Sequence, residues 1–192
     1  MNSPVARAMT ATEILRNEHA VILEAVGLLE LHAGDVREGA TLDGGFARWI
    51  VQFIREFADG THYAKEQGVL FGLLAAHGFS VDLEPLAGLL AEHAASRRLC
   101  DAMEAAQGAR DGQAFALAAQ QFCGLLRRHI RTEEEVVFSA AERLLTPAED
   151  IKAVQAFGRV VHEHDGVVIR QRHLAAIEHW QGAFEAALLV EA

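Results

Sequence analysis

The feature of this chain that most restricts its fold is an internal repeat of histidine and glutamate motifs. Residues 62–71 read His-x3-Glu followed by two spacers, two aliphatic residues and a phenylalanine, and residues 129–138 repeat this pattern. A Glu-His pair at residues 18–19 recurs at residues 92–93, so the order along the chain is EH, HxxxE, EH, HxxxE. One motif on each of four successive helices is typical of a duplicated helical hairpin.

Helix-forming residues dominate the sequence, and only three prolines occur. Because β-branched runs are also short, we predict an all-α fold. Thr10 and Thr146 each precede a glutamate by three residues, which is the spacing of a helix capping box. These signals and the glycine-rich breaks predict five helices, at about residues 10–34, 46–76, 85–107, 114–145 and 147–187. Four long helices with short loops predict an antiparallel up-down-up-down bundle, with the fifth helix outside it or across one end.

Length and charge restrict the organisation of the chain and its partners. With 192 residues and no linker rich in Pro, Gly or Ser, we expect one domain over 1–192, with the bundle at about 10–145. The additional C-terminal helix is expected at about 147–187. A net charge of −10 argues against nucleic acid and membrane as partners. The absence of a signal-like start and of an apolar run of about 18 residues predicts a cytoplasmic protein.

The repeated histidines and glutamates fall on apolar helix faces. His19 continues a stripe that contains Leu15 and Ile22 at spacings of three and four residues. A carboxylate on such a face is costly without a positive partner. No Lys or Arg lies in these stripes, so a metal ion is the expected partner. The six candidate metal ligands are His19, His62, Glu66, His93, His129 and Glu133.

The candidate ligands also lie at similar distances from loops predicted near residues 40, 80 and 110, which puts them at one height near mid-bundle. Four imidazoles and two carboxylates are too many for one ordinary zinc ion, which takes about four ligands. They suit two ions, each with two histidines, bridged by both carboxylates. Iron fits this donor set, with manganese, zinc or copper as alternatives. The sequence contains no Glu-x-x-His, which disfavours a ferritin-type centre.

On these motifs the chain resembles the hemerythrin family, in its bacterial HHE cation-binding branch, over roughly residues 10–145. The resemblance implies a non-haem di-iron centre held by the six candidate ligands, with the two glutamates bridging. It also implies oxygen binding, oxygen or redox sensing, nitric oxide and peroxide responses, or iron handling. The oxygen carriers have HxxxH on the third helix, whereas Arg97 follows His93 by four residues here. An open or water-filled position at one iron is therefore expected.

Several residues near the motifs are candidates for supporting roles. Tyr63 lies about 100° round the helix from the preceding histidine, so we expect it to pack or hydrogen-bond there rather than to bind metal. Glu18 and Glu92 are interpreted as surface groups or as groups that orient the ligand imidazoles. Cys100 is expected to be a buried thiol and Cys123 a partly exposed one.

Two functions of different classes fit these expectations. The first is a di-iron protein that binds or reacts with a small oxidant (O2, H2O2 or NO) in stress response or sensing, with peroxide consumption as the expected chemistry of an enzyme. The second is an iron-sensing or iron-storage module that regulates a partner without fast catalysis. A protein partner or a homo-oligomer stays open. A metal-free interaction domain is a third interpretation, which the inward glutamates disfavour.

Overall fold

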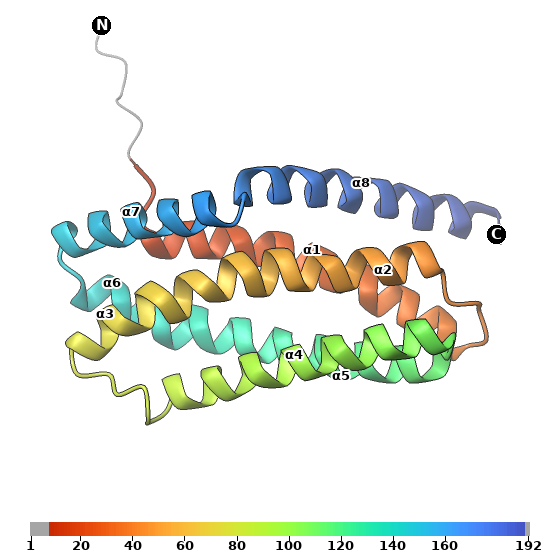
Figure 1. Cartoon of the computed structure of the whole chain (residues 1–192), viewed down its shortest axis with the longest axis horizontal. Coiled ribbons are helices and arrows are strands. Elements are labelled where there is room, and N and C mark those ends of the chain that lie inside the picture. The colour runs from red at the N-terminus through yellow and green to blue at the C-terminus, as the bar shows by residue number, and fades with distance from the viewer. Residues whose placement is uncertain (1–7, 191–192) are drawn as a thin grey trace, which may run out of the picture.

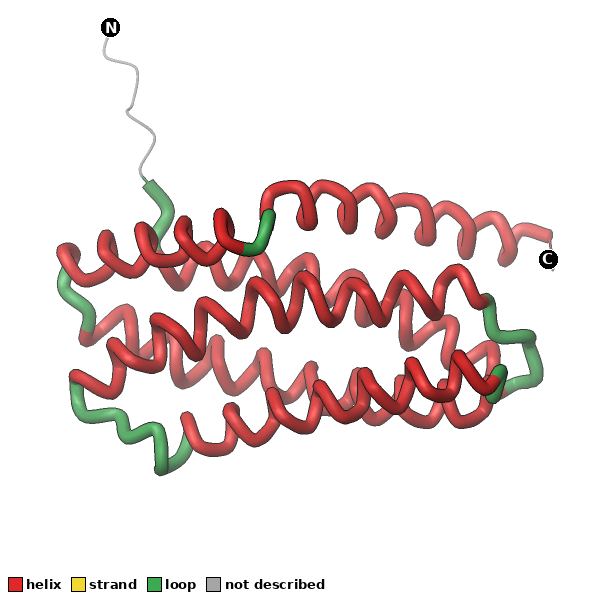
Figure 2. Tube along the Cα trace, in the orientation of Figure 1, coloured by secondary structure: helices red, strands yellow, loops and turns green. Residues whose placement is uncertain are grey.

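Residues 8–190 are described in a computed structural model, without the side chains of 187–190, and this part is helical with no strand (Figures 1 and 2). Its first four helical rods form a bundle. The first rod is α1 (Ala11–Arg37), and the third is α4 (Leu86–Ala109). The second rod joins α2 (Gly44–Phe53), the π-helical segments η1 (Ile54–Tyr63) and η2 (Glu66–Leu70), and α3 (Phe71–Ala76). The fourth rod joins α5 (Gly112–Thr132), the π-helical η3 (Glu133–Phe138) and α6 (Ser139–Leu144).

The rods alternate in direction along the long axis of the molecule (Figure 1). α1 packs against α5, α5 against α4, α4 against α2 and η1, and η1 packs back onto α1. The four rods therefore close into a square with four interfaces between neighbouring rods, which we call seams. The predicted all-α bundle is confirmed.

Local sequence signals set the helix ends. Thr10 forms the predicted capping box with Glu13, and Thr146 forms the second with Glu149. Pro147 occupies the first turn of α7 (Pro147–Glu163), where the missing N–H of proline costs nothing. Side-chain caps therefore satisfy backbone N–H groups that the first turns of these helices leave free.

The prediction of a single C-terminal helix is wrong, because α7 is followed by a separate helix, α8 (Gly166–Val190). Asp165 lies between the two helices and has φ 51°, in the left-handed region, so it interrupts the right-handed helical backbone. A Cβ atom on Gly166 would lie 3.0 Å from Thr61 Cγ2 and 3.2 Å from the carbonyl oxygen of Val161. The helix axis steps sideways at this point because glycine allows the chain to approach η1 closely.

The pair α7 and α8 lies along one seam of the bundle (Figure 1). α7 contacts α1 and η2, and α8 contacts α1, η1 and α2. The ring of Trp180 meets Phe46 edge-on at 5.3 Å, and Phe184 stacks on His32 at 5.7 Å. These two helices therefore cover the seam between the first and second rods, outside the bundle as expected.

The apolar core falls into two clusters along the bundle. One contains Val26, Phe53 and Phe122, and the other contains Leu15 and Phe157. A band of buried polar side chains at mid-bundle separates the two clusters. Within residues 8–190, no helix is both long enough and apolar enough to cross a membrane.

Candidate metal centre

All six predicted ligands meet in the polar band at mid-bundle, and each is 0–1% exposed. Their donor atoms form two overlapping groups, and within each group the atoms lie within 4.8 Å of one another. Both groups contain the two glutamates, and each contains a different pair of histidines. The groups are His19, His62, Glu66 and Glu133, and His93, His129, Glu66 and Glu133.

Each glutamate turns one oxygen to each histidine pair. Oε1 of Glu66 lies 3.0 Å from His62 Nε2, and its Oε2 lies 3.3 Å from His93 Nε2. Oε2 of Glu133 lies 3.3 Å from His19 Nε2, and its Oε1 lies 3.3 Å from His129 Nε2. Two carboxylates that face both histidine pairs in this way have the arrangement of bridging ligands between two cations.

The inner atoms of the cluster have too few hydrogen-bond partners. Among the described residues, none of the four oxygens of Glu66 and Glu133 makes a hydrogen bond of good geometry, and neither does His19 Nε2. The Nε2 atoms of His93 and His129 lie 3.0 Å apart. Buried polar atoms without partners destabilise a fold, so their convergence here needs a compensating charge. A divalent metal ion suits imidazole and carboxylate donors of this kind.

The outer nitrogen of each imidazole has a polar partner, and each of the four seams holds one such pair. The partner comes from a neighbouring rod in every case. The Nδ1 contacts are Glu18 with His62 at 3.1 Å, Gln67 with His93 at 2.6 Å, Glu92 with His129 at 2.9 Å, and Glu134 with His19 at 2.9 Å. Such contacts fix the ring orientation and leave Nε2 free to face the centre.

Glu18 and Glu92 thus take the orienting role that was one of their two interpretations, whereas sequence reasoning missed Gln67 and Glu134. A signal for the missed pair exists, because each directly follows the glutamate of an HxxxE motif.

A buried lysine stands beside the centre, and the sequence analysis did not anticipate it. Lys65 is 1% exposed and forms an ion pair with Glu18, which is itself 8% exposed. Burial alone would raise the pKa of Glu18, but His62 and Lys65 together lower it below its ordinary value. The apolar helix faces that carry the candidate ligands contain no Lys or Arg, as the sequence analysis states. Lys65 lies just outside these faces and is a cation beside the centre.

Aromatic rings pack against the histidines of the candidate metal centre. Tyr63 stacks on His93 with 3.6 Å between ring centroids, and burial raises the pKa of its hydroxyl. That hydroxyl has no hydrogen-bond partner in the described part of the chain, and Tyr63 belongs to neither donor group. Phe71 stacks on His93 at 6.2 Å, and Phe138 stacks on His19 at 5.3 Å. The phenylalanine that ends each HxxxE repeat therefore packs against an imidazole of another rod.

Charges in the cluster are strongly coupled. Burial opposes a positive charge on His62, but Glu66 and Glu18 outweigh it and raise the pKa of this imidazole to about 10. His129 follows the same logic, with Glu133 as the main partner, and its pKa also rises to about 10. The histidines hold the pKa of Glu66 well below its ordinary value despite its burial. Without metal, protons on His62 and His129 therefore balance negative charge of the inner carboxylates.

π-helical turns carry both glutamates and one histidine of the two HxxxE motifs, while His129 lies in α5. His62 lies in η1, and Glu66 and Glu133 begin η2 and η3. Thr61 Oγ1 donates to the carbonyl of Glu56, five residues earlier, at 2.9 Å, which suits the wider π turn. Insertions of this kind are frequent at functional sites and shift the side chains that follow. The apolar spacing in the sequence did not predict these π-helical turns.

The other histidines and the cysteines lie outside the donor groups. His173 contacts Glu56 at 2.9 Å, and His32 accepts a hydrogen bond from the backbone N–H of Asp43 at 3.1 Å. Cys100 is buried as expected, but Cys123 is also buried, so the expectation of partial exposure was wrong. The helix α5 turns this thiol toward the α1 backbone, where Sγ lies 3.8 Å from the carbonyl oxygen of Val26.

Comparison with known families gives a match to the hemerythrin HHE cation binding domain over residues 10–141. The match spans the four rods of the bundle and ends before α7. No curated protein and no solved structure matched the chain.

Proposed function

Because the chain belongs to the hemerythrin HHE cation-binding family, we propose that it is a non-haem di-iron protein of the bacterial branch that binds or reacts with a small oxidant. His19 and His62 hold one iron in this proposal, and His93 and His129 hold the other. Glu66 and Glu133 bridge the two. The observation that carries the proposal is the split orientation of the two carboxylates, each with one oxygen toward each histidine pair.

The donor set supports iron as the metal. Each position offers two imidazole nitrogens and two carboxylate oxygens, a mixture suited to borderline divalent ions. Manganese and zinc are the alternatives. Four protein donors leave room for a small molecule at an ion that accepts more than four ligands. Arg97, at the position of a further histidine in the oxygen carriers, is turned outward and pairs with Asp59 at 2.6 Å, so it takes no part.

Bound iron would supply electrons to an oxidant such as O2, H2O2 or NO. The chain's own residues would exclude water and restrict the size of the molecule that binds at the centre. Tyr63, Phe71 and Phe138 pack directly on the imidazoles, and all are at most 2% exposed. The outer partners, such as Glu18 and Glu92, hold the rings in place.

Metal content and the visible spectrum test the proposal. Protein from iron-supplemented cells should contain two irons per chain and show a near-ultraviolet band that changes on addition of peroxide. His129→Gln should lose iron, because it removes one of only four donors at its position. His162→Gln is the matched control, since His162 is exposed on α7. Circular dichroism establishes that both variants are folded.

The outcomes separate the alternatives. One zinc per chain would reject the di-iron assignment, and so would two irons retained in His129→Gln. Oxygen release from peroxide at a rate that depends on His129 would identify a peroxide-consuming enzyme. A spectrum that responds to oxidant without turnover would identify a binding or sensing role.

A sensing module is the second candidate, and the position of α7 and α8 favours it. These helices lie outside the family match, yet they pack on η2 and η1, which carry Glu66 and His62. A change at the centre therefore has a direct path to the outer surface. Hydrogen exchange of α8 with and without metal tests this path, and identical exchange in both states would reject it.

A further inference from the structure

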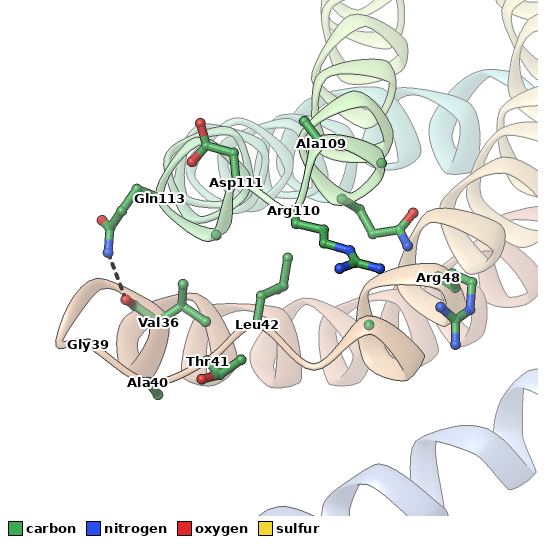
Figure 3. Close-up of a pocket in the computed structure, with 14 residues that line it drawn as sticks. Val36, Gly39, Ala40, Thr41, Leu42, Arg48, Ala109, Arg110, Asp111 and Gln113 are labelled. Carbon is green, nitrogen blue, oxygen red and sulfur yellow. Dashed lines mark hydrogen bonds between the residues drawn. The ribbon is translucent and has the colours of Figure 1, made fainter.

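A cavity of about 860 Å³ lies at one end of the bundle, between the α1–α2 loop and the α4–α5 turn (Figure 3). None of the candidate metal ligands or their partners lines it. Its walls combine two arginines, Arg48 and Arg110, with the amide of Gln107 and the apolar side chains of Val36 and Leu42. This volume falls within the range of small-molecule sites, about 300–1,000 Å³.

Both arginines of the cavity are without a carboxylate partner among residues 8–190. The nearby acids are already engaged. Asp43 accepts hydrogen bonds from the N–H groups of Gly45 and Phe46, and Asp111 accepts one from the N–H of Ala114. Two exposed arginines without an ion-pair partner among residues 8–190 therefore line the cavity, together with one acid, Asp111, although the chain as a whole carries a net charge of −10.

Arg110 adopts a backbone conformation that its residue type disfavours. Its φ is 57°, in the left-handed region, and it ends α4 as the C-cap. Helices prefer glycine or asparagine for such a left-handed ending, because the Cβ atom of other residues crowds the following carbonyl oxygen, whereas glycine has no Cβ and the polar side chain of asparagine can hydrogen-bond locally. Strain of this kind is concentrated at binding and catalytic sites. Figure 3 shows the Arg110 side chain reaching from the turn toward α2, where Arg48 lies.

The two walls of the cavity are tied together. Gln113 at the start of α5 donates a hydrogen bond from Nε2 to the carbonyl of Val36 at 2.9 Å (Figure 3). Arg37 donates to Gln120 Oε1 at 3.2 Å across the same interface. Both hydrogen bonds join α1 to α5, and a cavity with walls tied in this way loses less conformational entropy when it binds a ligand.

We propose that this cavity binds a small organic phosphate ester. The phosphate lies between Arg48 and Arg110, whose planar guanidinium groups suit two parallel hydrogen bonds to phosphate oxygens. The organic part lies against Val36 and Leu42. This site is independent of the proposed metal centre, because the two share no residue.

Isothermal titration calorimetry with phenyl phosphate tests the site. The wild-type chain should bind one equivalent, and Arg110→Asn should weaken binding by about tenfold or more, because it removes a guanidinium group that donates charge-assisted hydrogen bonds to the phosphate. Asparagine tolerates the left-handed backbone, so the fold is kept and the melting temperature should not fall. Arg98→Gln is the control, because Arg98 is exposed on α4 outside the cavity.

Competing probes decide the ligand class. Inorganic phosphate should bind more weakly than phenyl phosphate, and Leu42→Ser should remove that difference. Benzoate that binds as tightly as phenyl phosphate would overturn the assignment to phosphate esters. No saturable binding of phenyl phosphate, or an equal loss in Arg98→Gln, would overturn the site itself. Iron content should stay unchanged in Arg110→Asn, which separates this test from that of the metal centre.

Discussion

Replacing Lys65 with methionine is the sharpest test of the electrostatics around the centre. The chain has two lysines, Lys65 and Lys152, and they form a natural matched pair. Lys65 is 1% exposed and pairs with Glu18, whereas Lys152 is exposed on α7. Removing one partner of a buried ion pair costs about 3–5 kcal/mol, because the other charge remains buried. Glu18 keeps its contact with His62 at 3.1 Å, so we expect the lower end, about 3 kcal/mol.

The assay is urea unfolding of the metal-free protein, followed by circular dichroism. A loss of about 3 kcal/mol corresponds to a fall in melting temperature of roughly 6–12 °C for a chain of this length. The double variant Glu18→Gln/Lys65→Met should recover most of the loss, because no buried charge is left unpaired. Lys152→Met should change stability by less than about 0.5 kcal/mol. A double variant as unstable as Lys65→Met alone would refute the ion-pair argument.

Three further predictions follow from burial and charge. Removal of metal with a chelator should lower the melting temperature, because a ligand at about 1,000 times its Kd adds about 4 kcal/mol; an unchanged value would contradict metal binding in the folded state. Burial lowers the pKa of His32, His93 and His173 below the ordinary imidazole value. The stability that these three residues contribute to the metal-free protein should therefore be present above about pH 6.5 and be lost below it, since the unfolded chain binds protons that they resist. The raised pKa values of His62 and His129 act in the opposite sense, because their contribution is complete below about pH 6.5 and is lost as the pH rises toward about 10; thermal melts at about pH 5, 7 and 9 check both trends. Burial raises the pKa of Cys100 to about 11 and that of Cys123 to about 12, so iodoacetamide should label both only after unfolding.

The repeat made the bundle and its six inward side chains predictable. A motif such as His62-x3-Glu66 places both residues on one helix face, and its recurrence at residue 129 requires a second, equivalent helix. The equal distance of the motifs from the loops then placed them at one height. The structure brings these side chains together as expected.

Sequence reasoning did not predict which side chains pair across the seams. Glu18 precedes His19 in the chain but contacts His62 on the next rod, and Glu134 contacts His19 from the fourth rod. Spacing along one helix cannot reveal such pairs, because they depend on which rods become neighbours. The break between α7 and α8 was missed for a similar reason. It depends on the approach of Gly166 to Thr61, a contact between distant parts of the chain.

The cover that α7 and α8 place over one seam makes the two halves of the repeat unequal. Glu18 lies in the covered seam with a side chain 11% exposed, while its counterpart Glu92 lies in the opposite, uncovered seam at 33%. Water can stabilise the charge of Glu92 directly, but Glu18 needs a cation from the protein. Lys65 is that cation, and the equivalent residue in the second half, Thr132, is neutral. An ancestral duplication would have produced two interchangeable halves. Because α7 and α8 cover a seam in only one of them, each half is under its own selection pressure.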